Sequence, residues 1–204
     1  MFSRLFHYIK GPSPLHPSVV ANRLSPLTFR QFEPRDLDRC LELYALNEPD
    51  RFPEGVAKRY EEALTGGHSY FLVAEANGQI IASGGLSYSI RKDIAVLCFG
   101  LVHPAYQGKG IGTSLLLARL ALLKPKLPAY HVFIFAVERS FGFYRRFGFQ
   151  DFQAWKDPHG KAHPSGHLLV TDWDIGRIRV LLKKNKITVP EDEDKIPFRA
   201  KDEM

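Results

Sequence analysis

The sequence is poor in cysteine, and it has no long uninterrupted run of apolar residues. Of 204 residues only two are cysteines, Cys40 and Cys98. Both lie in apolar patterns without metal-ligand or redox spacing, which excludes a disulfide framework and favours reduced thiols in a cytoplasmic protein. No stretch approaches the roughly 18 apolar residues of a membrane-spanning helix, and the start lacks the apolar region of a secretory signal. We therefore expect no stable membrane insertion.

Several common ligand-binding signatures are missing as well. A dinucleotide fingerprint Gly-x-Gly-x-x-Gly counted from Gly108 would need glycine at Thr113, and the phosphate loop Gly-x-x-x-x-Gly-Lys-Ser/Thr does not occur. The net charge of +6 favours anionic ligands, but no platform of aromatic and basic residues indicates a nucleic-acid partner. His159, His163 and His167 have a metal-like spacing, yet the prolines and glycines between them forbid an aligning helix. We expect a solvated hairpin loop there and no metal.

Composition suits one compact domain with terminal extensions, because 45% of the residues are hydrophobic and 25% are charged. Residues 1–26 form an N-terminal extension rich in proline and free of acidic residues. That bias is shared with organelle transit peptides, but their Arg-rich amphipathic helix is missing. A docked or mobile leader is the preferred interpretation.

The C-terminal extension, 172–204, is predicted to contain one helix and a charged tail. Asp174 could cap a helix that places Ile175, Ile178 and Leu182 on one face. This face could pack on the sheet of the same chain, cover a homodimer contact or bound a substrate cleft. The residues from Glu191 onward are strongly charged, and we expect them to be mobile.

Residues 27–171 form the core domain, with an α/β organisation in a mixed sheet. Hydrophobic periodicity predicts the order βααβββαβαββ. Asp36 is the predicted cap of the first helix, and Asn77-Gly78 predicts a two-residue hairpin turn. The predicted strands are 27–32, 70–76, 79–88, 94–102, 130–136, 149–155 and 167–171, and the predicted helices are 37–45, 53–64, 110–123 and 141–147.

A glycine-rich turn, 107–112, joins the apolar strand 94–102 to the apolar helix that follows. Glycines take positive φ and have no Cβ, so consecutive backbone N–H groups can converge on one point. The positive end of the following helix dipole adds to the same point. The turn is therefore predicted to bind an anion, most simply a phosphate.

Two motifs resemble those of the GNAT superfamily of acetyl-coenzyme A-dependent N-acetyltransferases. The first is Val102-x-Pro104-x-Tyr106-Gln107-Gly108-Lys109-Gly110-Ile111-Gly112, and the second is Phe143-Tyr144-Arg145-Arg146-Phe147-Gly148-Phe149. The resemblance covers roughly 27–171 and implies the GNAT fold. It implies that acetyl-coenzyme A (acetyl-CoA) binds at a splayed strand and at the glycine turn. The implied coenzyme-binding residues are Leu101, Val102, Gln107, Gly108, Lys109, Gly110, Ile111, Gly112, Thr113 and Ser114.

The resemblance also implies a catalytic role for Tyr144, as the acid that protonates the coenzyme thiolate. Lys109 and Arg145 are expected to add positive charge near the phosphates. Many family members carry an asparagine seven residues before this tyrosine, where this chain has Val137. Some members carry a carboxylate base on the strand before the turn, but residues 94–99 offer none.

The base is therefore open. A water relay is the first choice, and Glu75, His68 and His103 are the side-chain alternatives. His103 could equally be a structural hydrogen bonder, and Glu75 a solvated strand residue.

The sequence thus predicts an N-acetyltransferase that passes the acetyl group directly to a primary amine in a ternary complex. A catalytically weak acyl-CoA-binding regulatory module is the alternative. The acceptor amine is not determined by the sequence. In the superfamily it is set by the segment here numbered 46–67, in which Glu48, Asp50 and Glu54 could attract a cation, and by the closing hairpin.

Overall fold

The computed structural model describes residues 24–47, 56–88, 94–123, 131–156, 162–170 and 174–198. Within these residues eight strands form one mixed sheet in the order β6-β7-β5-β4-β3-β2-β1-β8. The β4–β5 and β1–β8 pairs are parallel, and the other pairs are antiparallel. The strands are β1 (Leu27–Gln31), β2 (Tyr70–Ala76), β3 (Gln79–Tyr88), β4 (Ile94–Val102), β5 (His131–Val137), β6 (Gln150–Lys156), β7 (Ala162–Val170) and β8 (Ile187–Thr188).

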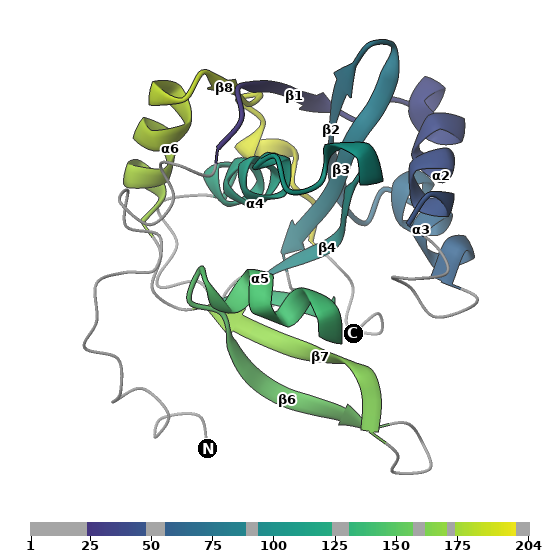
Figure 1. Cartoon of the computed structure of the whole chain (residues 1–204), viewed down its shortest axis with the longest axis vertical. Coiled ribbons are helices and arrows are strands. Elements are labelled where there is room, and N and C mark those ends of the chain that lie inside the picture. Colours follow the sequence, from purple (N-terminus) through teal and green to yellow (C-terminus); the bar gives the residue numbers. More distant parts are fainter. Residues whose placement is uncertain are drawn as a thin grey trace.

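Helices cover both faces of this sheet (Figure 1). They are α2 (Leu37–Ala45), α3 (Val56–Thr65), α4 (Ile111–Ala121), α5 (Phe141–Arg145) and α6 (Ile175–Lys184). Short 3-10 turns precede α2, α4 and α5 and follow β8, at Pro34–Asp36, Pro104–Tyr106, Glu138–Ser140 and Glu193–Lys195. Successive residues of β2 belong to different cores: Tyr70 and Leu72 pack with α4, whereas Phe71 and Val73 pack with α2 and α3. This alternation is the period of two expected of a strand buried on both faces. The mixed α/β fold and the element order predicted for the core domain are confirmed.

The Asn77-Gly78 hairpin is also confirmed. Asn77 has φ of 51° and Gly78 has φ of 72°, the left-handed conformation that a two-residue turn between twisted strands requires.

The predicted start of β7 differs from the structure, and the predicted start of α3 lies outside the described residues. α3 begins at Val56 in the described residues, and its predicted start at residue 53 lies outside them. β7 begins at Ala162 rather than at residue 167, so His163 lies in a strand and the predicted loop is wrong at this position, whereas His167 lies in a strand as predicted. His159 lies outside the described residues. β7 accommodates Pro164, which has no N–H to donate, because the β6–β7 register is irregular between Ala154 and Lys156.

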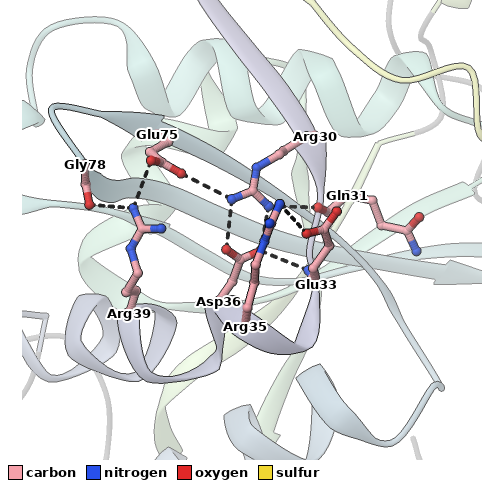
Figure 2. A network of polar contacts seen from close by, with 8 residues as sticks. All are labelled: Arg30, Gln31, Glu33, Arg35, Asp36, Arg39, Glu75 and Gly78. Carbon is pink, nitrogen blue, oxygen red and sulfur yellow. Dashed lines mark hydrogen bonds and ion pairs between the residues drawn. The ribbon is translucent and has the colours of Figure 1, made fainter.

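Asp36 does not cap α2 with its side chain, which corrects the sequence prediction. Figure 2 shows the alternative: the Asp36 carboxylate faces Arg30, with Nη1–Oδ2 and Nη2–Oδ1 distances of 2.6 and 2.8 Å. It also accepts the backbone N–H of Glu33 at 2.9 Å. The carboxylate is fully buried, and its hydrogen bond with Arg30 holds the pKa of Asp36 below the ordinary value.

The C-terminal helix packs on its own chain. Asp174 Oδ1 accepts the N–H of Arg177 at 3.0 Å, which confirms the predicted cap. Ile178, Leu181 and Leu182 are buried in the core that contains α4. Of the three alternatives left open by the sequence, intramolecular packing is the one observed, with α4 as the direct partner.

The charged stretch after α6 is docked on the sheet, so the prediction of a mobile tail is wrong for residues 191–198. Asp192 Oδ2 accepts the Tyr70 hydroxyl at 2.6 Å, and Pro197 O accepts the backbone N–H of Tyr88 at 2.8 Å. Ile196 is only 4% exposed. An isolated apolar residue in a charged run gave too weak a signal to predict this contact.

The described helices include none that is long and apolar enough to cross a membrane. Cys40 is buried, and Cys98 is half-buried with its Sγ 3.8 Å from Ser69 Oγ. Burial raises the pKa of Cys40 to about 11, so this thiol is a core residue in its neutral form.

Candidate active site

Strands β4 and β5 diverge in the middle of the sheet. They pair from Ile94–His131 to Leu97–Ile134, and no later residue of β4 pairs with β5 in the described structure. On the other edge of β4, the register against β3 shifts between Ser83 and Gly85. Phe99 takes a left-handed conformation there, with φ of 45°. The bulge pushes β4 out of line with β5, which is the splay that the sequence motifs implied.

The splay leaves a backbone edge of β4 open toward β5. His103 N donates to Ile81 O of β3 at 2.8 Å, and successive residues of a strand point their polar groups to opposite edges. The N–H and C=O of Val102 therefore face the β5 side. The Val102 carbonyl accepts Nε2 of Gln107 at 2.9 Å, and the sheet leaves its N–H available to a ligand.

The glycine turn follows directly. Gly108 and Gly110 have φ of 73° and 86°, so both need the left-handed region that glycine enters without steric penalty. Gly110 is the N-cap of α4. The backbone N–H groups of the turn and of the first helical turn thus stand at the positive end of the helix dipole, as the sequence predicted.

A cavity of about 760 Å³ opens between the splayed strands. Eight of the ten predicted coenzyme-binding residues line it, and Ile111 and Ser114 are buried beside it without reaching its surface. The eight are Leu101, Val102, Gln107, Gly108, Lys109, Gly110, Gly112 and Thr113.

The cavity is positively charged. Lys109, Arg119, Arg139 and Arg146 line it, and the described lining includes no aspartate or glutamate. Arg146 faces the cavity in place of Arg145, which stacks on Phe141 with a 5.5 Å separation. A cationic cavity beside a glycine turn suits a ligand that carries several phosphates.

Residues before β1 close one side of the turn. Leu24 lines the cavity, and Ser25 N donates to Ser114 Oγ at 3.1 Å. The Ser25 hydroxyl donates to the carbonyl of Lys109. Ser114 is thus engaged with the segment leading into β1, and its implied contact with the coenzyme stays a prediction.

Tyr144 reaches the cavity from α5. Its side chain is 7% exposed and is held by Phe143 and Phe149, with ring centroids 5.0 and 5.5 Å away. Burial raises the pKa of Tyr144, whereas the charge and hydrogen bond of Arg119 oppose that rise. The hydroxyl is therefore protonated at neutral pH, the form that a general acid requires.

Arg119 was not predicted from the sequence. It lies in α4 at 1% exposure, with its guanidinium 3.4 Å from Leu115 O and 3.3 Å from Cys98 O. It was the one charge inside a helix that is otherwise apolar on nearly every side. A charge on the buried face of such a helix was the available signal.

Asn47 was also missed, because a single asparagine after a helix carries no distinctive pattern. It is 2% exposed; its Nδ2 donates to Leu43 O at 2.8 Å, and its Oδ1 accepts Nε2 of Gln107 at 3.3 Å. The end of α2 thereby orients Gln107, which in turn bonds the open edge of β4.

None of the three candidate side-chain bases lines the cavity. His103 Nδ1 accepts the N–H of Ala105 at 3.2 Å, which is the structural role expected of it. Glu75 pairs with Arg39 and Arg30 at 3.2 Å each (Figure 2), and these bonds lower its pKa. His68 is exposed at the end of the loop before β2. Among the described groups, no side-chain base faces the reacting position.

Comparison with known proteins agrees with this architecture. A putative acetyltransferase of the GNAT family from Desulfovibrio desulfuricans superposes with a TM-score of 0.58 at 16% identity, over 70% of this chain and 97% of that one. The PaiA N-acetyltransferase of Thermoplasma acidophilum, in complex with coenzyme A, gives 0.54 at 19% identity, over 71% and 98%. The ribosomal-protein-S18-alanine N-acetyltransferase of Escherichia coli gives 0.53 at 17%, over 72% and 94%. No curated protein matches the chain.

These likenesses show the fold, a mixed α/β domain shared with these solved structures. Residues 67–151 also match the family model described as the acetyltransferase (GNAT) domain. This segment runs from the end of α3 to the start of β6, and so contains both the turn and Tyr144. Residues 67–151 therefore resemble an acetyltransferase domain of the GNAT family.

Proposed function

We propose that the protein binds acetyl-CoA in the cavity between β4 and β5 and transfers the acetyl group directly to a primary amine in a ternary complex. The observation that carries the proposal is the continuous path from the open edge of Val102 to the left-handed glycines Gly108 and Gly110. A strand edge can bind the amide-bearing pantetheine arm, and the turn can bind the pyrophosphate. The coenzyme supplies the activated thioester.

The residues present fit this ligand. Gly108 stands in open space, because a Cβ added there would meet no atom within 4 Å. Backbone donors at the turn are therefore accessible to phosphate oxygens. Lys109 and Arg146 can neutralise phosphate charge without a competing carboxylate in the described lining.

Tyr144 is proposed as the acid that protonates the leaving thiolate. Collapse of the tetrahedral intermediate breaks the C–S bond and leaves the electron pair on sulfur. A buried phenol whose pKa is raised by burial holds its proton at neutral pH and can deliver it as that charge develops. Deprotonation of the amine is assigned to water, since no described side-chain base lines the cavity.

The direct test compares Tyr144→Phe with a matched control. Loss of a positioned acid is expected to lower kcat about 10²–10⁴-fold, while acetyl-CoA affinity is retained because the ring remains. Tyr70→Phe is the control, since Tyr70 is also a buried, hydrogen-bonded tyrosine but bonds Asp192 outside the cavity. Equal turnover by the Tyr144→Phe variant and the wild type would remove the acid role.

The assay must sample acceptors broadly, because the proteins named among the structural neighbours differ in substrate. They include an S18-alanine N-acetyltransferase and an aminoglycoside 6′-N-acetyltransferase. Release of free thiol from acetyl-CoA should be followed with amino acids, peptides, polyamines, aminoglycosides and simple primary amines.

The second candidate is a catalytically weak acyl-CoA-binding module. Val137 lines the cavity at the position where many family members carry asparagine, and no described carboxylate or histidine joins it there. Saturable coenzyme binding without thiol release for any amine would favour this alternative. Absence of both binding and thermal stabilisation by acetyl-CoA would refute both candidates.

A further inference from the structure

Arg119 is a buried cation at the floor of the cavity. The described part of the chain places no carboxylate within ion-pair distance of it, and its guanidinium donates to two backbone carbonyls, Leu115 O and Cys98 O. Both bonds are long, at 3.4 and 3.3 Å. A guanidinium without an anionic partner is unfavourable in a protein interior. Packing alone therefore does not explain why a charged side chain is buried here.

Two glycines make the room that this side chain occupies. A Cβ added to Gly84 of β3 would lie 3.1 Å from Arg119 Nε, and one added to Gly100 of β4 would lie 3.0 Å from Nη2. The same Cβ on Gly100 would lie 3.4 Å from the Tyr144 hydroxyl. The guanidinium and the hydroxyl thus both lie close to the backbone of Gly100, where β4 separates from β5.

In the hydrogen bond between Arg119 and Tyr144, the donor and the acceptor are fixed by chemistry. A guanidinium carries only donors, so the Tyr144 oxygen must accept an N–H of Arg119. The proton of the Tyr144 hydroxyl is then directed away from Arg119. Because both side chains line the cavity, that proton is available to a group bound there.

We propose that Arg119 is a positioning residue for Tyr144: it aims the hydroxyl proton into the cavity and stabilises the phenolate formed when that proton leaves. The proposal rests on the proposed function. The C–S bond breaks, its electron pair stays on sulfur, and the proton passes from the Tyr144 oxygen to sulfur. Water takes the proton released by the attacking nitrogen as the C–N bond forms and passes it to the Tyr144 oxygen, which restores the phenol.

The charge of Arg119 also predicts a pH effect. Burial raises the pKa of Tyr144 and Arg119 opposes this rise, so removal of the charge must move that pKa further upward. An acid works only while protonated, and the alkaline limb of kcat would therefore move to higher pH in Arg119→Gln. A merely structural role for Arg119 predicts no such movement.

The first measurement does not depend on turnover. Tyrosines labelled with ¹³C at the ring carbon bearing oxygen are titrated by NMR, with the Tyr144 signal assigned through Tyr144→Phe. Arg119→Gln is expected to raise the pKa of Tyr144, and Arg119→Lys to raise it less because the charge is kept. Arg179→Gln is the control, since Arg179 bonds Ala121 O and pairs with Glu193 outside the cavity. An unchanged Tyr144 titration in Arg119→Gln would overturn the pairing.

The second measurement is a kinetic double-mutant cycle. Arg119→Gln is expected to lower kcat about tenfold to hundredfold, the size of a lost charge-assisted hydrogen bond, with little change in KM for acetyl-CoA. Because Arg119 acts through Tyr144, the double variant should be no slower than Tyr144→Phe alone. Additive losses would overturn the positioning role. A wild type that transfers acetyl to no amine would refute the proposed function, and the catalytic part of this inference with it, while the NMR titration still decides the pairing.

A variant that keeps Arg119 tests the same inference in case the Arg119 variants do not fold. Gly84→Ala should crowd the guanidinium at Nε and shift it from Tyr144, giving a smaller loss of kcat of the same kind. Gly142→Ala is the matched control, because its added Cβ meets no atom within 4 Å. Equal kcat for the two alanine variants would contradict the inference.

Discussion

Gly112→Ala should separate the stability of the fold from coenzyme affinity. Unlike Gly108 and Gly110, Gly112 has no positive φ. An added Cβ would contact Phe143 and Val102 at 3.8 Å, which is ordinary van der Waals contact. The methyl group therefore fits the protein but occupies the cavity beside the first turn of α4, where the pyrophosphate is proposed to bind.

Gly112→Ala is expected to raise the stability of the unliganded protein and to lower its affinity for coenzyme A. Replacing glycine in the first turn of a helix by alanine should stabilise the unliganded protein by about 0.5 kcal/mol, which is roughly 1–2 °C in Tm for a chain of this size. Obstruction of charge-assisted hydrogen bonds to phosphate should weaken coenzyme A binding by about 1.5–3 kcal/mol, or roughly 10–100-fold in Kd. Gly110→Ala, with φ of 86°, should instead lose about 1–2 kcal/mol of stability.

Two assays check this prediction. Thermal unfolding of the unliganded proteins gives Tm, and calorimetric titration with coenzyme A gives Kd. Gly142→Ala again serves as the control, with no contact formed and coenzyme affinity expected to stay at the wild-type value. Wild-type affinity in Gly112→Ala would show that the phosphates do not approach this turn, and the binding mode would be refuted.

Three further predictions concern the frame of the site. Asp36→Asn should destabilise the protein by about 2–3 kcal/mol at neutral pH, because Arg30 loses its buried partner. Folding lowers the pKa of Asp36. The stabilisation by the Asp36 carboxylate is therefore full above its unfolded pKa near 4 and is lost as pH falls through its folded pKa. Urea unfolding at several pH values checks this, and a penalty that does not shrink in acid would contradict it. Asn47→Ala should weaken coenzyme A binding about threefold to tenfold through Gln107, by the loss of one hydrogen bond, with equal Kd as the contrary result in calorimetry. Removal of residues 191–204 should lower stability by about 3 kcal/mol, for one buried aliphatic side chain and one backbone hydrogen bond; an unchanged Tm on thermal unfolding would show that the docked tail is dispensable.

Local patterns predicted the central part of the fold well. The Asn77-Gly78 turn and the glycine turn need left-handed φ values that few other sequences adopt, and both have them in the structure. The apolar run after the turn was predicted as a buried helix, and it forms α4. These features depend on neighbouring residues in the chain, which the sequence displays directly.

The remaining features depend on distant partners. β8 has two residues and exists because Ile187 and Thr188 pair with β1. The carboxylate of Asp36 turns to Arg30 instead of to α2 because a bidentate pair is stronger than a cap. No local rule favours either outcome, since both are decided by tertiary contacts.

In the candidate site, too, the features set by neighbouring residues were predicted and those set by distant contacts were not. The left-handed turn beside the cavity was predicted from its glycines, because glycine adopts positive φ without steric penalty. Arg119 and Asn47, the side chains proposed to organise the reacting end, were missed because these roles depend on contacts with Tyr144 and Gln107 on other elements. The charge of Arg119 in an apolar helix was a signal that a buried, paired group should be sought.

The most direct test of the account is amide mapping of coenzyme binding by NMR. Titration of ¹⁵N-labelled protein with coenzyme A should give saturable shifts of the N–H signals of Val102, Gly108 and Gly110, with signals of α6 and β8 unchanged. Saturable shifts confined to these β4 and turn positions would support the proposed seat. Absence of saturable shifts, or shifts centred elsewhere while the β4 edge and the glycine turn stay silent, would contradict it.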